Sequence, residues 1–424
     1  MAPAVKPMRV AGTPERADVD GIERELRRLW SSLDGDPSPP PQAAAAQVTR
    51  ICTLTLLAVV RNGRPGEAAA LAQHLGERYP SRSIILDLPA AEAGAAPSVV
   101  RPHEGSRVDG RLDVEIALHC HAPGATGRQA VCCEQISVTA AGRAIARVPA
   151  LVLPLLVPDL PVYLWWPEDP PSAGSGAEGT AADPAADLLR RLAEGADALI
   201  VDSGTMRRPV AGLAAVSSLA GRLPGGVRDL TWGRLTPWRD LLVQCFDPAP
   251  MRQALERLER IRIRTDGDAA APSRAPDAAG AAASSGQERD PIAGLLLGGW
   301  LAGRLGWEPA GPARREGTIL RALFWRGGGG LELAVEGGAG PIASLECAAG
   351  GSEPFSLSIT RQSGAAAVDI ETRLGRGRPR TTAAALAAPD AAALIGAELE
   401  LAEADHVLRE SLDIVLRIMS GVRA

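Results

Sequence analysis

The amino-acid sequence predicts an α/β protein with layered, mostly parallel sheet domains and flanking helices, followed by a C-terminal antiparallel meander closed by a long helix. Residues 49–88 have the pattern strand, helix, strand, a crossover that makes a parallel pair. Two further apolar strands, 162–166 and 196–203, are separated by a helical segment and extend this alternation. After residue 311, five strand-like runs alternate with glycines, which is typical of a meander.

The N-terminal part, residues 1–44, is predicted to be a tail with one amphipathic helix and a linker. Ile22, Leu26 and Leu29 recur at helical spacing with charged residues between them, so one helix face must dock on the rest of the protein. The Pro- and Ala-rich residues 35–46 follow as the linker.

Residues 45–166 are predicted to form an N-terminal α/β domain that ends in a strand, 162–166. Prolines interrupt the apolar run before this strand and exclude one continuous helix. Because a strand sends neighbouring side chains to opposite faces, Trp165 and Trp166 are expected to enter two different layers. The pair belongs to a core strand, or one of the two indoles faces a protein partner.

Residues 167–310 are predicted to form a second α/β domain, in which 267–289 is a disordered low-complexity segment. Its first loop contains Gly174-x-Gly176-x-x-Gly179, which has the spacing of a dinucleotide fingerprint. The glycines lie in a polar loop beyond the strand and not in a tight strand-to-helix turn, so we expect no cofactor.

The strand 196–203 ends in Asp202 and Ser203. Open α/β sheets bind ligands at the carboxyl ends of their strands, so this pair is a candidate ligand edge. Helix capping accounts for the same residue types equally well. The remaining residues, 311–424, are predicted to form the meander and a closing helix, 391–419.

A dense group of Trp and Arg residues lies between 229 and 240. Thr236 and Pro237 are expected to cap and begin a helix that places Trp238 and Arg239 in an exposed first turn. With Trp232 and Arg234 just upstream, the group predicts a stacked, hydrogen-bonding surface. The alternative is that the stem of each Arg covers a buried Trp and keeps its charged head in solvent.

Composition excludes several classes of function. The net charge is −5 and no stripe is dense in Lys or Arg, so no nucleic-acid partner is expected. No apolar run reaches the roughly 18 to 20 residues that cross a bilayer, so no membrane partner is expected; Gly294 with Gly298 and Gly299 with Gly303 are attributed to close helix packing. Without a secretion signal or a disulfide framework, a cytoplasmic location is the simplest expectation.

His119, Cys120 and His121, together with Cys132 and Cys133, are of metal-ligand type. Strand alternation points neighbouring side chains in opposite directions, so we expect no metal site. A redox-responsive pair such as Cys120 with Cys132 and inert packing of all three cysteines both stay open.

Catalytic motifs are missing from the sequence. It contains no Walker A run, no Gly-x-Ser-x-Gly, no His-Glu-x-x-His and no Cys-x-x-Cys, and Ser203 has no evident His base. We therefore expect no nucleophilic catalysis by Ser203. One hypothesis for these residues is a sugar-phosphate-binding α/β enzyme that uses Asp202, Ser203, Arg234 and Arg239.

Several stretches also match one known family in the same order along the chain. They are Tyr79-Pro80-Ser81-Arg82, Cys132-Cys133-Glu134-Gln135-Ile136, 155–166, 199–203, 229–239, 299–307, 398–399 and 405–412. Together they resemble the glucose-6-phosphate dehydrogenase assembly proteins of the OpcA family. Departures lie mostly in Ala- and Gly-rich loops, notably 267–289.

The resemblance implies a non-catalytic partner of glucose-6-phosphate dehydrogenase that promotes its active oligomer and so supports NADPH production in the oxidative pentose phosphate pathway. In photosynthetic bacteria it also implies a link to thioredoxin. Under this hypothesis the Trp/Arg surface of 232–239 contacts the partner, together with one of Trp165 and Trp166.

Overall fold

The structure is a computed structural model. It describes residues 8–34, 47–61, 65–89, 110–121, 129–171, 184–267, 289–327, 329–401 and 403–422. The predicted linker at 35–46, the glycines at 174–179 and residues 268–288 of the predicted disordered segment lie outside the described residues.

The chain packs into two compact units that interleave along the sequence. Unit 1 comprises Met1–Val201, Leu219–Val227 and Ile395–Glu403, and unit 2 comprises Asp202–Ser218, Arg228–Leu394 and Ala404–Ala424. The division into four parts, 1–44, 45–166, 167–310 and 311–424, stays a prediction.

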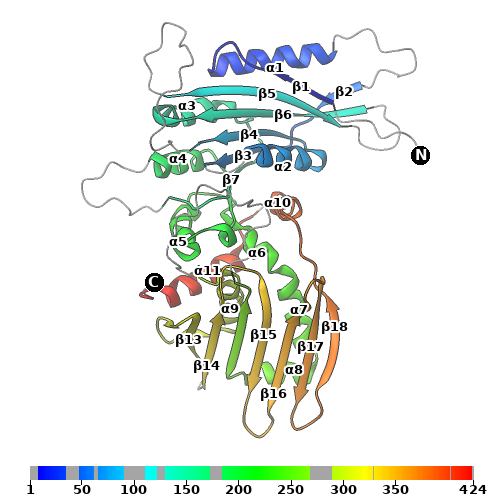
Figure 1. Cartoon of the computed structure of the whole chain (residues 1–424), viewed down its shortest axis with the longest axis vertical. Helices are drawn as coiled ribbons and strands as arrows, with labels where there is room; N and C mark the ends of the chain where they lie inside the picture. Colours follow the sequence, from blue (N-terminus) through cyan, green and yellow to red (C-terminus); the bar gives the residue numbers. More distant parts are fainter. Residues whose placement is uncertain are drawn as a thin grey trace. The chain divides into compact units, whose positions relative to one another are not determined.

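The first sheet confirms the predicted, mostly parallel architecture (Figure 1). Its strands are β1 (Met8–Gly12), β2 (Gln47–Arg50), β3 (Leu54–Val60), β4 (Ser81–Asp87), β5 (Leu112–His121), β6 (Gln129–Ala140), β7 (Val162–Trp166), β8 (Ala198–Val201) and β9 (Val227–Asp229). Their order is β1-β5-β6-β4-β3-β7-β8-β9, and β2 also pairs with β6. Pairing is parallel from β6 through β4, β3 and β7 to β8, and antiparallel from β1 through β5 to β6.

The predicted strand–helix–strand crossover is β3, α2 (Pro65–Arg78) and β4, with β3 parallel to β4. The N-terminal amphipathic helix is α1 (Val19–Asp34), and it buries Ile22, Leu26 and Leu29 as predicted. The other helical segments of this unit are η1 (Gly142–Arg147), α3 (Val148–Val152), η2 (Leu153–Leu155) and α4 (Pro184–Ala193).

The tryptophan pair lies in the core of unit 1. All five residues of β7 are buried, and the exposed fractions of Trp165 and Trp166 are 8% and 0%. The turn before the strand places Asp159 at a φ of 62°, a left-handed conformation that non-glycine residues rarely adopt. Both indoles are therefore core residues, and a contact between either one and a partner stays a prediction that requires the strand to open.

The second sheet confirms the antiparallel meander. Its strands are β10 (Arg260–Thr265), β11 (Glu308–Pro309), β12 (Arg314–Glu316), β13 (Ile319–Arg326), β14 (Gly329–Glu336), β15 (Ile342–Ala349), β16 (Phe355–Arg361), β17 (Ala367–Leu374) and β18 (Arg380–Ala385). Their order is β11-β13-β14-β10-β15-β16-β17-β18, with β12 on β13. One feature differs from the expected meander, because β10 lies between β14 and β15 and runs parallel to β14.

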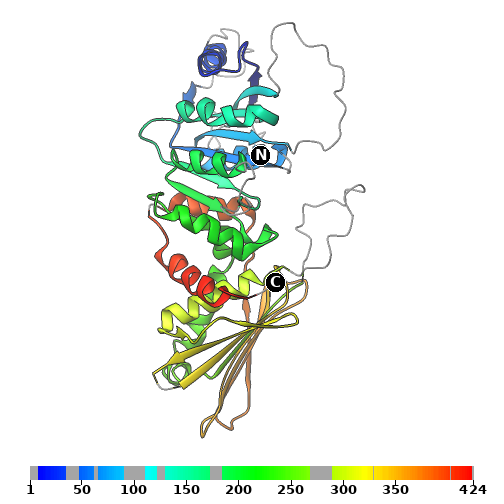
Figure 2. The same cartoon turned by 90° about the vertical axis from the view of Figure 1, so that its left-hand side faces the viewer.

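Helices cover one side of the second sheet (Figure 2). The helical segments that lie wholly or partly in unit 2 are η3 (Ser203–Thr205), α5 (Pro209–Ala220), α6 (Leu230–Arg234), α7 (Thr236–Phe246), α8 (Ala249–Leu255), α9 (Ile292–Leu305), α10 (Ala391–Glu400) and α11 (His406–Met419). Strand β10 buries its two isoleucines on one side and sends Arg260, Arg262 and Arg264 to the other. This alternation shows that one face of the sheet is a core face and the other is polar.

The glycines of α9 confirm the predicted close packing. A Cβ on Gly298 would lie 2.5 Å from the Leu333 side chain of β14, so this face of the helix touches the sheet. A Cβ on Gly299 would lie 2.6 Å from the carbonyl oxygen of Ser411, so the neighbouring face touches α11. Such approaches are possible only without a side chain at these positions.

The single closing helix expected at 391–419 is divided into α10 and α11. The carboxylate of Asp405 accepts hydrogen bonds from the backbone N–H groups of Val407 and Leu408 at 2.8 and 2.9 Å, which begins α11. Within unit 1, Tyr163 donates to the carbonyl oxygen of Leu399 at 3.0 Å, so the end of α10 packs there. Among the described residues, no helix is long and apolar enough for a bilayer crossing.

Candidate functional site

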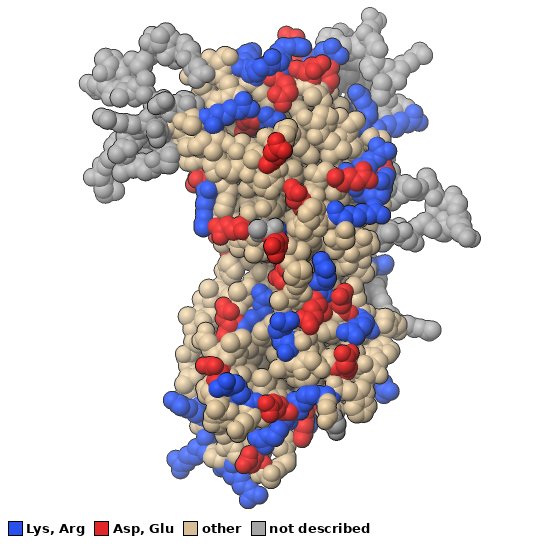
Figure 3. Space-filling view, turned by 180° about the vertical axis from the view of Figure 1, so that it is seen from behind, with Lys and Arg blue, Asp and Glu red and all other residues tan. Residues whose placement is uncertain are grey.

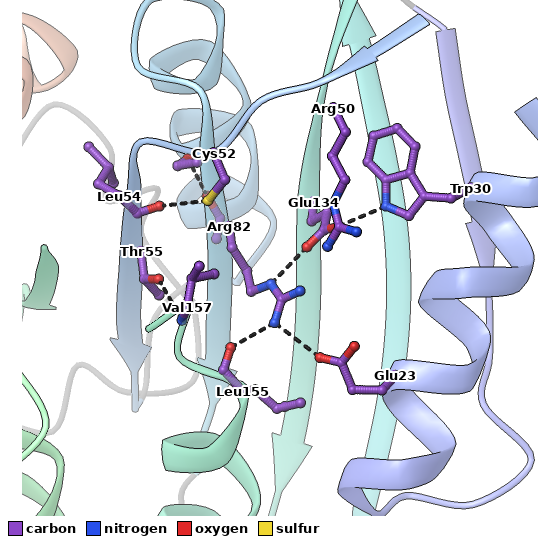
Figure 4. A network of polar contacts seen from close by, with 12 residues as sticks. Glu23, Trp30, Arg50, Cys52, Leu54, Thr55, Arg82, Glu134, Leu155 and Val157 are labelled. Carbon is purple, nitrogen blue, oxygen red and sulfur yellow. Dashed lines mark hydrogen bonds and ion pairs between the residues drawn. The ribbon is translucent and has the colours of Figure 1, made fainter. Parts of the chain in front are cut away.

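A buried ion pair lies in unit 1, where β4 and β6 run side by side (Figure 4). The side chains of Arg82 and Glu134 are 7% and 6% exposed, and Nε of Arg82 donates to Oε2 of Glu134 at 2.7 Å. Nη1 of Arg82 donates to the carbonyl oxygen of Leu155 at 2.8 Å and to Oε1 of Glu23 at 3.1 Å. Burial lowers the pKa of Arg82, but the charges of Glu134 and Glu23 outweigh it and raise the pKa overall, so the guanidinium stays charged.

Two more side chains hold the second oxygen of Glu134. Nε1 of Trp30 donates to Oε1 at 2.7 Å, and Nη2 of Arg50 lies 2.8 Å from the same atom. The guanidinium of Arg50 also lies over the Trp30 ring, 5.5 Å from its centroid. Residues from α1, β2 and β4 therefore meet on one carboxylate of β6, which ties the N-terminal helix to the sheet.

A half-open cavity of about 480 Å³ lies beside this pair. It is lined by Glu23, Arg50, Cys52, Arg82, Glu134, Pro154, Leu156, Val157, Pro158 and Leu160. The half-buried Cys52 donates to the carbonyl oxygen of Leu54 at 3.3 Å, and burial raises the pKa of its thiol. Cys52 is therefore a protonated thiol at neutral pH and not an activated nucleophile.

The sequence analysis did not find this cavity, although a signal for it was present. Arg82, Glu134 and Leu155 belong to three of the stretches that carry the family resemblance, 79–82, 132–136 and 155–166. Those stretches are far apart in the chain, and they meet at the ion pair through the hydrogen bonds described above.

In unit 2 the structure pairs Arg234 with Asp202, and a ligand at the predicted edge of Asp202 and Ser203 stays a prediction. The guanidinium of Arg234 forms a two-pronged pair with Asp202, with Nη1 2.7 Å from Oδ1 and Nη2 2.7 Å from Oδ2. The hydroxyl of Thr231 also donates to Oδ1 of Asp202, at 3.2 Å. Fork geometry of this kind satisfies both carboxylate oxygens, so the pair holds the loop in place.

The hydroxyl of Ser203 donates to Asp229, a residue that the sequence analysis did not single out, at 2.6 Å. The backbone N–H groups of Ser203 and Thr231 donate to the other oxygen of Asp229 at 2.9 and 3.1 Å, so Asp229 caps α6. Asp202 precedes η3 but its side chain makes no capping hydrogen bond there. Burial raises the pKa of Asp229 to about 6, helped by the charge of Asp202 and opposed by the donors. Because the folded protein holds this proton more tightly than the unfolded chain, Asp229 makes stability fall as pH rises from about 4 to about 6.

The Trp/Arg group confirms the interpretation in which an Arg covers a buried Trp. Trp232 is buried, and the guanidinium of Arg239 lies 3.6 Å from its ring centroid. Nε1 of Trp232 donates to Asp405 at 2.7 Å, so the indole is fixed at the start of α11. Arg234 turns away to Asp202 and does not share this stack.

Two details of this group were predicted wrongly. Trp238 is buried at 2% exposure and not exposed in the first turn of its helix, and the guanidinium of Arg361 in β16 lies 5.8 Å from its ring centroid. Thr236 begins α7 without capping it; its hydroxyl instead accepts a hydrogen bond from Nη2 of Arg239 at 2.8 Å.

Cys120 and Cys132 form a disulfide between register partners of β5 and β6. Cys133 is a free, buried thiol 3.4 Å from the carbonyl oxygen of Gly76, and burial raises its pKa. Both ring nitrogens of His119 are buried without a hydrogen-bond partner in the described structure. No cluster of three or more possible metal ligands occurs among the described residues, and a redox role for the three cysteines stays a prediction.

Fold and contacts define a two-unit α/β protein in which the charged and aromatic motif residues pair with one another. Two family models match the chain in succession. Residues 72–218 match the glucose-6-phosphate dehydrogenase subunit N-terminal domain, and residues 225–412 match the C-terminal domain of the same subunit. The chain therefore belongs to this family, whose models carry the name OpcA.

The relatives are cyanobacterial. A "Putative OxPP cycle protein OpcA" of Synechocystis is 26% identical over 210 residues, which are 50% of this chain and 37% of the relative. The protein of the same name from Nostoc punctiforme is 26% identical over 268 residues, 62% of this chain and 48% of the relative. The chain thus spans half or less of the length of these two curated relatives.

Among solved structures, an NAD binding oxidoreductase from Klebsiella pneumoniae is similar with a TM-score of 0.43 and 9% identity. The similarity covers 88% of this chain and 96% of that one. A likeness at this level carries no argument about activity.

Proposed function

We propose that this protein is a non-catalytic assembly factor that binds glucose-6-phosphate dehydrogenase, promotes its active oligomer and activates it allosterically. In this role it supports NADPH production in the oxidative pentose phosphate pathway of the cytoplasm. The observation that carries the proposal is the ordered match of residues 72–218 and 225–412 to a glucose-6-phosphate dehydrogenase subunit. Thioredoxin is a second proposed partner, because one disulfide, Cys120–Cys132, is present.

The pairing of charged residues supports a binding role. In unit 2, Asp202 is engaged by Arg234, and the hydroxyl of Ser203 is engaged by Asp229. A nucleophile needs a base that can take its proton and an open approach for substrate. Asp229 is 1% exposed, so this serine is held in a closed network.

We place the contact with the dehydrogenase on the outer face of α7. Arg239 lies over Trp232 there, and Val243, one helical turn further on, is 59% exposed. Arginine is enriched among the residues that carry most of the binding energy of protein interfaces, and the exposed Val243 adds apolar area beside it. On the molecular face in Figure 3, basic and acidic side chains are interspersed, so charge does not single out a patch on that face.

The test is to mix the purified protein with glucose-6-phosphate dehydrogenase from the same organism and to measure oligomer mass by light scattering together with the rate of NADPH formation. We expect a larger oligomer and a faster rate. Arg239→Ala should weaken both effects, whereas the matched change Arg252→Ala, at an exposed position of α8, should leave them intact. An unchanged dehydrogenase would contradict the proposal.

A second candidate is a sugar-phosphate-binding enzyme, because Arg234 pairs with Asp202, which directly precedes Ser203. A phosphate would have to displace Asp202 from Arg234, and Arg239 lies over Trp232 instead. Saturable binding of glucose 6-phosphate with turnover, both lost in Arg234→Ala, would favour this candidate over the assembly factor.

A further inference from the structure

The cavity beside Arg82 and Glu134 keeps hydrogen-bonding capacity that the fold does not use. Nε and Nη1 of Arg82 are occupied, but Nη2 makes no hydrogen bond with the described residues. Oε1 of Glu23 receives Arg82, while Oε2 of Glu23 has no partner among them. One nitrogen with two N–H donors and one acceptor oxygen therefore remain, on two residues that line the same cavity.

The other part of the cavity lining is apolar. Its members are Pro154, Leu156, Val157, Pro158 and Leu160. They belong to η2 and the turn that leads into β7, and the positive φ of Asp159 within that turn fixes its path. A cavity that combines an apolar lining with an unused donor nitrogen and an unused acceptor oxygen can receive a backbone amide together with an apolar side chain.

The charges of the cavity balance. Arg50 and Arg82 contribute two positive charges, and Glu23 and Glu134 contribute two negative charges. An anion would be attracted by both guanidiniums and repelled by both carboxylates. A cation would be attracted by the carboxylates and repelled by the guanidiniums. An uncharged ligand has no such penalty, because peptide groups offer the required N–H and C=O without net charge.

We propose that this cavity receives an extended, uncharged peptide segment of the protein partner, with a backbone amide between Arg82 and Glu23 and an apolar side chain against the proline-rich wall. The proposal rests on the proposed function, since it supplies a second contact of the dehydrogenase, on unit 1. It assigns a binding role to residues 154–160, the proline-interrupted run before β7. Three family stretches converge on this cavity, which a purely structural ion pair does not require.

Cys52 gives a direct readout because its half-buried thiol lines the cavity. The rate of its alkylation by N-ethylmaleimide is measured by mass spectrometry at about pH 8.5, where a thiol of raised pKa reacts measurably. The buried thiol of Cys133 in the same unit reports general opening of the fold. We expect the dehydrogenase to slow the labelling of Cys52 by about tenfold or more, without slowing that of Cys133.

A blocking variant provides the second measurement. Leu160→Trp fills the cavity from its half-buried edge and should weaken complex formation by about tenfold or more, while Leu374→Trp, an exposed position of unit 2, should not. Hydrogen exchange of β4 must be unchanged in both variants.

The outcomes separate the two proposals. A complex that forms while Cys52 stays equally reactive, and that tolerates Leu160→Trp, overturns the cavity proposal and leaves the assembly function standing. Protection of Cys52 by inorganic phosphate alone overturns it in favour of an anion site. Labelling of Cys52 as slow as that of Cys133 in the free protein overturns it because the cavity is then closed, and failure to form any complex overturns both proposals.

Discussion

Replacing Arg82 by Met should destabilise unit 1 by about 3 kcal/mol. Removing one partner of a buried ion pair typically costs roughly 3 to 5 kcal/mol, because the remaining charge stays buried. The lower end applies here, since Glu134 keeps Trp30 and Arg50 after Arg82 is lost. In the double variant Arg82→Met/Glu134→Gln the buried carboxylate of Glu134 is also removed. The double variant should therefore recover part of the stability that Arg82→Met alone loses.

Hydrogen exchange measured by mass spectrometry on β4 and β6 is the assay, because a two-unit chain need not unfold in one step. A loss of about 3 kcal/mol corresponds to exchange about 150-fold faster for amides that open with the core. The exposed pair Arg9–Glu115, 53% exposed on each side, is the control, and its removal should cost less than about 1 kcal/mol. If Arg82→Met changes the exchange no more than Arg9→Met does, the buried pair does not hold the sheet as argued.

Three further predictions concern stability. Gly299→Ala should cost about 2 kcal/mol in thermal unfolding because its Cβ would lie 2.6 Å from a backbone oxygen of α11, whereas Gly330→Ala, which meets open space, should be nearly neutral. Asp229→Asn should remove a pH dependence in which the wild type loses up to about 3 kcal/mol between pH 4 and 6.5, as measured by urea unfolding at several pH values. Cys132→Ser should cost about 3 kcal/mol, and a reductant should produce the same loss only in the chain that retains Cys120 and Cys132.

Local patterns predicted the elements well where neighbours in sequence are neighbours in space. The crossover of β3, α2 and β4, the buried strand β7 and the meander follow from periodicity and turn residues. The place of β10 between β14 and β15 did not follow, because alternation shows which face of a strand is buried but not which strands flank it.

The candidate sites divide in the same way. Asp202 and Arg234 could be named as candidate residues from the sequence. Their pairing with each other, which the sequence did not predict, occupies both side chains and weakens the case for a ligand edge. The burial of Trp238 and the ion pair of Arg82 with Glu134 depend on side chains that approach from distant strands. Spacing along the chain contains no information about such partners.

The aromatic and basic motifs of this chain therefore act mainly within the fold. Trp165, Trp166, Trp232 and Trp238 are all buried, so residues of the type that anchors interfaces stabilise the core here. A partner must instead meet atoms that the fold leaves unpaired or exposed. Nη2 of Arg82 lies where three motif stretches meet and is still free to bond, which makes the cavity in unit 1 a stronger place for specific recognition than the buried indoles.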